Sequence, residues 1–328
     1  MFKYVCKRIV YMIFVFVIMS FIMFFLYNLI PGDPARAEVE PMKNKLKPQE
    51  YEILYQQARD RLGLDDPLIV RYGRWFGNLL TGDLGDSSQY KAPVTQIMVS
   101  PMKTTIFINI FSIALALGIT IPLGIVCAVR RKSTLDNVVQ VGTIVGYSLP
   151  VFIIGLVSIF VFAVKLRWFP VSGMSTPNFK GTAIEVFLDK MKYLALPLFV
   201  MTIGSLGGMT RYVRAAMIEA LRMDYVRTAR AKGLREKVVI YSHAWRNALL
   251  PVITLIIGWF ISIFSGSMII ENMFAINGMG KLYYTALMNQ DYNVALAMQM
   301  FYMVLALLGN LIIDLSYGLV DPRVRVNN

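Results

Sequence analysis

The sequence predicts an all-α polytopic membrane protein with six transmembrane helices, and three observations lead to this fold class. The 328 residues are 56% hydrophobic and only 16% charged, with a mean hydropathy of +0.56, which is too apolar for an ordinary soluble domain. Six apolar runs meet or approach the roughly 20 residues that a helix needs to cross a hydrocarbon core of about 30 Å. The basic residues gather at alternate ends of these runs, as residues that determine membrane topology do.

The six predicted spans fix the order of the elements. They cover approximately residues 9–30, 106–129, 138–164, 193–210, 249–270 and 294–320. The fourth run gives the weakest signal because it contains Pro197 and several glycines. The first run follows basic residues and precedes an Ala-x-Ala sequence, so it imitates a cleavable signal peptide. Its length of about 22 residues exceeds the 7 to 15 apolar residues typical of such peptides, which favours an uncleaved helix.

Charge predicts which side each loop faces. Basic residues lie before the first span, at 130–132 after the second, throughout 211–246 after the fourth, and at 323 and 325 after the sixth. These segments are expected in the cytoplasm, with both termini on that side because the number of spans is even. The predicted organisation is therefore an N-terminal end and first span at 1–30, an extracytoplasmic loop at 31–103, a core of five spans at 104–320 that includes a cytoplasmic loop at 211–248, and a cytoplasmic tail at 321–328.

The long outer loop is expected to fold into short helices. Pro48 suits a first helical turn, apolar residues recur at helical spacing up to residue 62, and Gly63 stands where a C-terminal cap belongs. A second helix is predicted over residues 67–80. Packing on neighbouring elements or on the membrane interface is the main interpretation, and direct contact with a substrate is the alternative.

Two features inside the spans bear on helix packing. The pairs Gly142 with Gly146 and Gly204 with Gly208 have the small-xxx-small spacing that allows close helix approach, although generic packing would give the same pattern. Prolines in or at the start of four spans can bend those helices; they are Pro122, Pro150, Pro197 and Pro251.

The residues that enzymes and cofactor sites need are scarce. His243 is the only histidine, and Cys6 and Cys127 are the only cysteines, so a multi-histidine zinc site, a cysteine cluster and a disulfide framework are not indicated. Gly280 and Lys281 come nearest to an ATP-binding phosphate loop, but Ala275 replaces its first glycine and Leu282 replaces its hydroxyl residue. Asp314 is the lone candidate for a buried intramembrane acid, which disfavours a proton-driven carrier. Nucleic-acid binding is disfavoured because the positive charge lies at the ends of apolar runs.

The segment 224–251 is the candidate functional site. Between residues 211 and 246 there are nine Lys or Arg and three acidic residues. Each basic side chain costs about 2.5 to 3.5 kcal/mol at a bilayer centre, so this segment must lie in water or against protein. One helix is predicted from residue 211 to 232, ending at Gly233, and a second from 236 to 247 before Pro251 opens the fifth span. The two helices would form a basic knob that enters a groove on a partner; a solvated loop that only fixes topology is the alternative.

Several motifs resemble one family of transport proteins. YVRTARAKG at 225–233 and HAWRNALLPVIT at 243–254 resemble the cytoplasmic loop of ABC importer permeases of the dipeptide, oligopeptide and nickel family. PGDP at 31–34, LPVF at 149–152, SGSMIIENMF at 265–274, GMGKL at 278–282 and DPRVR at 321–325 are similar to that family as well. Arg227, Thr228 and Ala229 stand where the general motif has Glu-Ala-Ala, a form usual in this branch. Asn277 departs from the proline common before the outer Gly-x-Gly turn.

The resemblance implies a type I ABC importer permease fold, with an N-terminal helix and a five-helix core, in a bacterial or archaeal cytoplasmic membrane. Such a permease forms half of a translocation pore for peptides, pairs with a second homologous permease, and receives its substrate from an extracytoplasmic solute-binding protein. Two ATP-binding subunits would hold the ATP and magnesium, so this chain would carry no cofactor and would not itself be an enzyme. Nickel chelates, glutathione or oligosaccharides are alternative substrates, and a proton-coupled carrier or a receptor scaffold is an alternative function.

The resemblance also implies which residues contact the ATPase. The docking residues would be Arg227, Thr228, Ala229, Arg230, Ala231, Lys232 and Gly233, and the junction between loop and helix would be Leu250 and Pro251.

Overall fold

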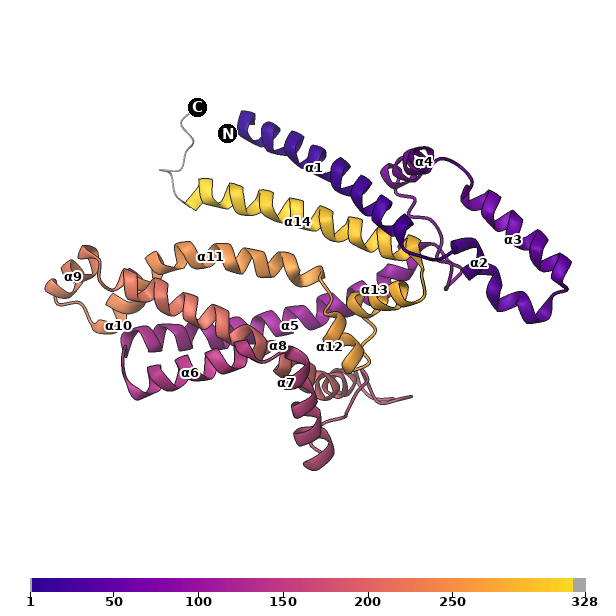
Figure 1. Ribbon diagram of the computed structural model, residues 1–328. Coiled ribbons are helices and arrows are strands. Elements are labelled where there is room, and N and C mark those ends of the chain that lie inside the picture. Colours follow the sequence, from indigo (N-terminus) through magenta and orange to yellow (C-terminus); the bar gives the residue numbers. More distant parts are fainter. Residues whose placement is uncertain (1, 321–328) are drawn as a thin grey trace. The chain divides into compact units, whose positions relative to one another are not determined.

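The computed structural model describes residues 2–320, which form helices joined by turns and loops (Figure 1). The chain divides into two compact units. Unit 1 holds the residues up to Lys103 together with Asn277–Leu311, and unit 2 holds Thr104–Ile276 together with the residues from Ile312 on. The functional division drawn from the sequence stays a prediction, and the tail at 321–328, with its DPRVR motif, lies outside the described residues.

Unit 1 combines the N-terminal part of the chain with a later segment that begins at Asn277. Its elements are α1 (Phe2–Leu29), α2 (Pro34–Val39), η1 (Glu40–Lys45), α3 (Pro48–Leu62), α4 (Leu68–Leu80), the first residues of α5 (Val94–Val129), α13 (Met279–Met288) and most of α14 (Tyr292–Val320). Phe24 and Tyr27 of α1 are buried in one apolar cluster with Val94, Leu282 and Met298. Burial of these side chains joins the N-terminal helix to the two C-terminal helices of the unit.

The short helices predicted in the outer loop are confirmed. Pro48 is the first residue of α3, where a missing backbone N–H costs nothing. Gly63 ends this helix in the left-handed conformation at φ 59°, which a glycine adopts without strain. Pro67 precedes α4, whose Trp75 packs against Phe24 with ring centroids 5.2 Å apart. The loop is therefore an ordered part of unit 1.

Unit 2 contains the remaining helices. They are the rest of α5, then α6 (Thr134–Ser148), α7 (Val151–Ser158), the π-helix η2 (Ile159–Lys165), α8 (Ala183–Ala220), α9 (Asp224–Ala231), α10 (Glu236–Val238), the π-helix η3 (Val239–Trp245), α11 (Arg246–Ile261), η4 (Ser262–Phe264) and α12 (Met268–Met273). Two apolar clusters hold the unit together. The one that includes α9 is called the α9-side core; its buried residues are Ile125, Ala128, Met209, Val213, Met217, Ala220, Val226, Ala229, Val239, Ala244, Ala248 and Val252.

Five of the described helical segments are long and apolar enough to cross a membrane. They are Val5–Leu29, Val94–Val129, Ala183–Ala220, Glu236–Phe264 and Tyr292–Ser316. The third predicted span is different, because α6 and the α7–η2 segment meet at a bend of 101°. Leu149 is extended, at φ −79° and ψ 129°, because Pro150 restricts the residue before it and lacks a backbone N–H. The third predicted span is therefore bent at Pro150, one of the prolines expected to bend their helices, and six spans require the bent pair to count as one.

The fifth span also ends earlier than predicted. The helix stops at Phe264 rather than at residue 270, and Ser265 is extended. Asn109 of α5 donates from Nδ2 to the backbone oxygens of Ile263 and Ser265, at 2.8 and 3.0 Å. These hydrogen bonds satisfy carbonyls that the ended helix leaves open. Ser267 then caps the separate helix α12.

Of the glycines in the two predicted pairs, Gly146 faces α8, where an added Cβ would lie 3.7 Å from Cγ2 of Ile203, but the closest approach of α8 to α6 is at another glycine. A Cβ atom at Gly142, Gly204 or Gly208 would have no neighbour within 4 Å. A Cβ atom at Gly207 would lie 2.7 Å from the Cβ of Tyr147 and 2.8 Å from the backbone oxygen of Thr143. Gly207 is thus the position at which α8 touches the backbone of α6, and the packing role predicted for the other pair on α8 was wrong for contacts within the described chain.

Candidate functional site

Helix α9 forms the centre of the predicted docking segment. Asp224 stands in its first turn, where a negative charge complements the helix dipole. Gly233 ends it at φ 73°, and its N–H donates to the carbonyl of Arg230 at 2.9 Å. The single helix predicted from 211 to 232 is interrupted, because α8 stops at Ala220 and a turn precedes α9. The result is a short separate helix at one end of α8 and α11 (Figure 1).

One face of α9 is buried in the α9-side core. Val226 is fully buried and Ala229 is 3% exposed, and both pack in the cluster that contains Val213 and Met217 of α8 and Val239 of η3. Side chains buried at i and i+3 lie on one side of a helix. This packing fixes the orientation of α9 on the spans.

The other face of α9 is exposed and basic. Six of the seven predicted docking residues are exposed; they are Arg227, Thr228, Arg230, Ala231, Lys232 and Gly233. Ala229 is the exception, since it is part of the buried face. Arg227 lies 3.4 Å from Asp224, and Arg230 lies 2.7 Å from Glu236 of α10. Both ion pairs are solvent-exposed and therefore contribute little to stability.

The predicted junction at Leu250 and Pro251 lies inside a helix. Pro251 belongs to the interior of α11, which begins at Arg246, and the π-helix η3 comes directly before it. The prediction that Pro251 opens the fifth span was therefore wrong. The physical reason is that η3 and α11 are continuous, so the chain has entered the helix before the proline. Leu250 is exposed at 45%.

Among the residues that the structure describes, three acids are buried, and the predicted Asp314 is not one of them. Asp314 is half-buried, whereas Asp136, Glu271 and Asp291 are each at most 5% exposed. Thr105 donates to Glu271 at 3.0 Å, and Ser87 donates to Asp291. Each of these carboxylates accepts hydrogen bonds, as buried charges require.

Asp136 makes the strongest of these arrangements. Nε and Nη2 of Arg214 donate to its two carboxylate oxygens, both at 2.7 Å. The backbone N–H of Lys132 donates to the same carboxylate at 2.9 Å, and the N–H of Asp136 donates to Ser133 Oγ. This pair was not among the residues predicted from the sequence. The Ser-x-x-Asp spacing at 133–136 is a helix-capping signal that indicates where α6 begins, but it does not indicate the arginine 78 residues later.

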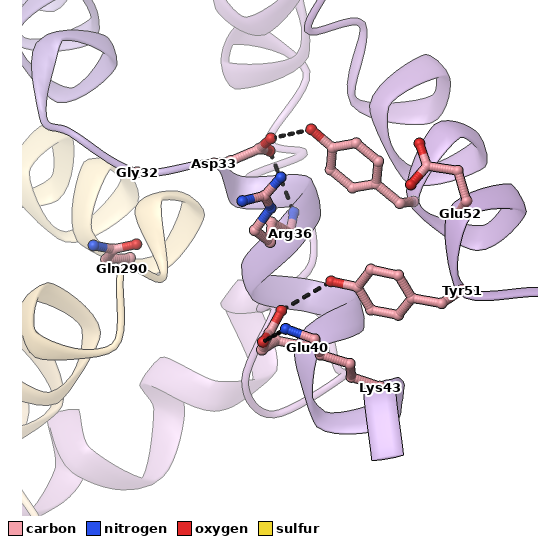
Figure 2. Close-up of a pocket in the computed structure, with 9 residues that line it drawn as sticks. Gly32, Asp33, Arg36, Glu40, Lys43, Tyr51, Glu52 and Gln290 are labelled. Carbon is pink, nitrogen blue, oxygen red and sulfur yellow. Dashed lines mark hydrogen bonds and ion pairs between the residues drawn. The ribbon is translucent and has the colours of Figure 1, made fainter. Parts of the chain in front are cut away.

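Unit 1 contains a polar cleft of about 600 Å³, which the sequence did not indicate (Figure 2). Glu40 lies in it and accepts from Tyr51 at 2.8 Å and from Lys43 at 2.9 Å. Arg36 stands over the ring of Tyr55, with 5.6 Å from its guanidinium carbon to the ring centroid. Acidic and basic side chains both line the cleft, so its lining is not of one charge.

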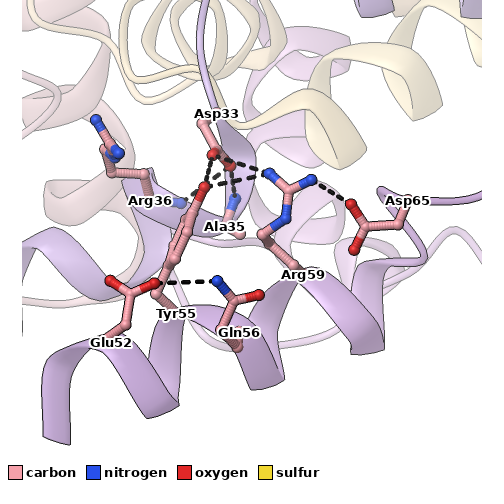
Figure 3. A network of polar contacts seen from close by, with 8 residues as sticks. All are labelled: Asp33, Ala35, Arg36, Glu52, Tyr55, Gln56, Arg59 and Asp65. Carbon is pink, nitrogen blue, oxygen red and sulfur yellow. Dashed lines mark hydrogen bonds and ion pairs between the residues drawn. The ribbon is translucent and has the colours of Figure 1, made fainter. Parts of the chain in front are cut away.

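Asp33 is the centre of a hydrogen-bond network at the edge of this cleft (Figure 3). Its carboxylate accepts from Tyr55 and from the backbone N–H groups of Ala35 and Arg36, and Arg59 lies 3.6 Å away. Burial raises the pKa of Asp33, but these donors outweigh burial and hold the pKa below its ordinary value. The network closes α2 onto α3.

The sequence matches known proteins over almost its whole length. Residues 120–326 match the family described as binding-protein-dependent transport system inner membrane component, and residues 1–124 match the N-terminal part of that membrane component. The chain is 37% identical over 322 residues to the oligopeptide transport system permease protein AppB of Bacillus subtilis, covering 98% of each chain. It is 34% identical over 339 residues to the di/tripeptide transport system permease protein DppB of Pseudomonas aeruginosa, covering 99% of each.

A solved structure confirms the fold. A chain of the MetNI methionine ABC transporter, in an inward-facing conformation, matches with a TM-score of 0.50 and 15% identity, covering 68% of this chain and 97% of that one. The all-α polytopic fold and the family indicated by the sequence motifs are both confirmed. The chain therefore belongs to the binding-protein-dependent transport system inner membrane component family, and it is a permease subunit of an ABC importer that passes several times through a membrane.

Proposed function

We propose that this permease forms half of the pore of a peptide importer in a bacterial or archaeal cytoplasmic membrane, with both termini in the cytoplasm. The observation that carries the proposal is the agreement over the full chain with relatives named as oligopeptide and di/tripeptide permeases. A second homologous permease completes the pore, and an extracytoplasmic solute-binding protein delivers the peptide. Two ATP-binding subunits bind ATP and magnesium and supply the energy.

The exposed face of α9 is the proposed contact with an ATP-binding subunit. The side chains of Arg227 and Lys232 project from a helix whose opposite face is anchored by Val226 and Ala229. Shifting a two-state equilibrium from 1:99 to 99:1 requires about 5.5 kcal/mol of differential binding. A helix packed on the core can transmit such a bias to the spans, whereas a loop without buried contacts would absorb it.

Two variants test the contact. Gly233→Pro removes the N–H that donates to Arg230 and cannot adopt φ 73°, so it should distort the end of α9. Lys232→Glu reverses one exposed charge and leaves the ion pair between Arg230 and Glu236 intact. Both variants should insert in the membrane at the wild-type level, lose most ATPase co-purification, and lose ATP-dependent peptide uptake.

The control carries a larger charge change elsewhere in unit 2. Lys180→Glu with Lys190→Glu alters exposed residues near the start of α8, at the end remote from α9. This double variant should co-purify with the ATPases normally. Normal co-purification and uptake by Gly233→Pro and Lys232→Glu would refute the assignment of α9 as the docking helix.

A further inference from the structure

Helices α6 and α8 form a closely packed antiparallel pair that ends in a buried ion pair. Gly207 faces Tyr147 and Thr143, and seven residues along each helix Arg214 meets Asp136. Later residues of α8 therefore contact earlier residues of α6, which shows that the two helices run antiparallel. The carboxylate of Asp136 is 1% exposed, and the arginine side chain is 22% exposed.

The ion pair is the part of this interface that specifies register. At Gly207 α8 presents backbone without a side chain, which allows close approach but offers no projection that would oppose sliding. The guanidinium of Arg214 makes two parallel hydrogen bonds, a geometry that tolerates little displacement. The N–H of Lys132 holds the same carboxylate to the turn before α6, so Asp136 cannot follow a moving arginine without disturbing that turn.

The same stretch of α8 also carries α9. Val213 and Met217 flank Arg214 in sequence, are fully buried, and pack in the α9-side core with Val226 and Ala229. One turn of α8 is therefore bonded to α6 on one side and packed against α9 on another.

We infer that Asp136 and Arg214 are positioning residues for transport, which hold α6 in register with α8 so that a displacement of α9 also moves the bent pair α6–α7. This inference rests on the proposed function, in which α9 receives that displacement from an ATPase subunit. The two residues act through the helices and do not contact the transported substrate.

The experiment measures coupling in the complete transporter. The permease pair, the ATPases and the solute-binding protein are reconstituted in vesicles, and peptide uptake and ATP hydrolysis are recorded in the same preparation. Asp136→Asn and Arg214→Gln should assemble and hydrolyse ATP, but the ATP consumed per peptide should rise about tenfold, within the 5- to 150-fold range of typical coupling between sites. Arg211→Gln removes an exposed charge from the same helix and should leave the ratio unchanged.

The ATP consumed per peptide distinguishes a positioning role of the two residues from a purely structural one. If uptake and hydrolysis fall together, in proportion to the amount of assembled complex, the inference is overturned. If the other single variants do not assemble, Arg214→Lys is measured in their place, since lysine keeps the charge but cannot form two parallel hydrogen bonds. An unchanged ratio in that variant would also overturn the inference. Absence of ATP-dependent peptide uptake by the wild-type complex would instead refute the proposed function.

Discussion

Two adjacent glycines on α8 allow a sharp test of how α6 and α8 pack. Gly207 is buried against α6, and Gly208 is exposed with open space around it. Gly207→Ala and Gly208→Ala make the same chemical change one residue apart, in the same helix. Both variants should gain about 0.8 to 1.0 kcal/mol of helix propensity, because alanine is the better helix former. The stability difference between the two variants therefore reports the contact with α6.

The structure gives the size of the expected difference. The new Cβ at position 207 would lie 2.7 Å from the Tyr147 Cβ and 2.8 Å from the Thr143 backbone oxygen, whereas ordinary contact begins at 3.4 Å. The two helices would have to separate locally by about 0.7 Å, which loses dispersion contacts along the interface. Overpacking of this kind costs about 1 to 3 kcal/mol. At position 208 the added methyl group meets nothing, so the propensity gain remains.

Thermal unfolding of the purified permease in detergent measures the effect. Gly208→Ala should melt at or above the wild-type temperature, and Gly207→Ala should melt at least about 2 °C below Gly208→Ala, as 1 kcal/mol shifts the melting temperature of a domain of 150 to 250 residues by about 2 to 4 °C. Equal melting temperatures for the two variants would show that α6 and α8 do not approach at Gly207, and the described register would be refuted.

Three further outcomes are expected. Because the folded-state pKa of Asp33 is depressed, its network contributes stability above the ordinary value near 3.9 and loses it as the pH falls further; Asp33→Asn should remove this acid-sensitive step from proteolysis profiles of the outer segment. Thr210 is fully buried and its hydroxyl has no hydrogen-bond partner in the part of the chain that the structure describes, so Thr210→Val should leave the melting temperature unchanged or raise it. Ser205→Ala, which removes a hydroxyl that donates to Met201 at 3.0 Å, should lower the melting temperature instead, and the opposite order would contradict the assignment.

The sequence predicts the elements that depend on local signals. The helix from Pro48 to Gly63 is bounded by a proline suited to the first turn and by a glycine suited to the last, and both positions are observed. The span lengths follow from hydropathy for the same reason. Local signals do not predict the angle at which two helical segments meet. The sequence around Pro150 is compatible with a mild kink as well as with the observed bend of 101°.

The residues of the candidate site show the same limit. Gly233 and the exposed basic residues of α9 could be selected from composition and from the family motifs. The burial of Ala229 and the partnership of Asp136 with Arg214 depend on how α8 packs against other helices, and no spacing in one sequence encodes that contact. Pro251 was misplaced because the π-helix η3 has no recognised sequence signal.

The bent pair also bears on how the chain runs between the two ends of unit 2. The turn before α6 and helix α9 lie at the same end of unit 2, because Asp136 bonds Arg214 and Ala128 shares a core with Val226. The chain from the turn before α6 to α9 leaves this end of unit 2 and returns to it, so it runs the length of the unit an even number of times. Helix α8 accounts for one of these passages. The α6–α7 segment together with the chain up to α8 must therefore run from this end of unit 2 to the end at which α8 begins, despite the bend of 101°. The salt bridge thus places the positive charges of residues 130–132 and those of α9 at one end of unit 2.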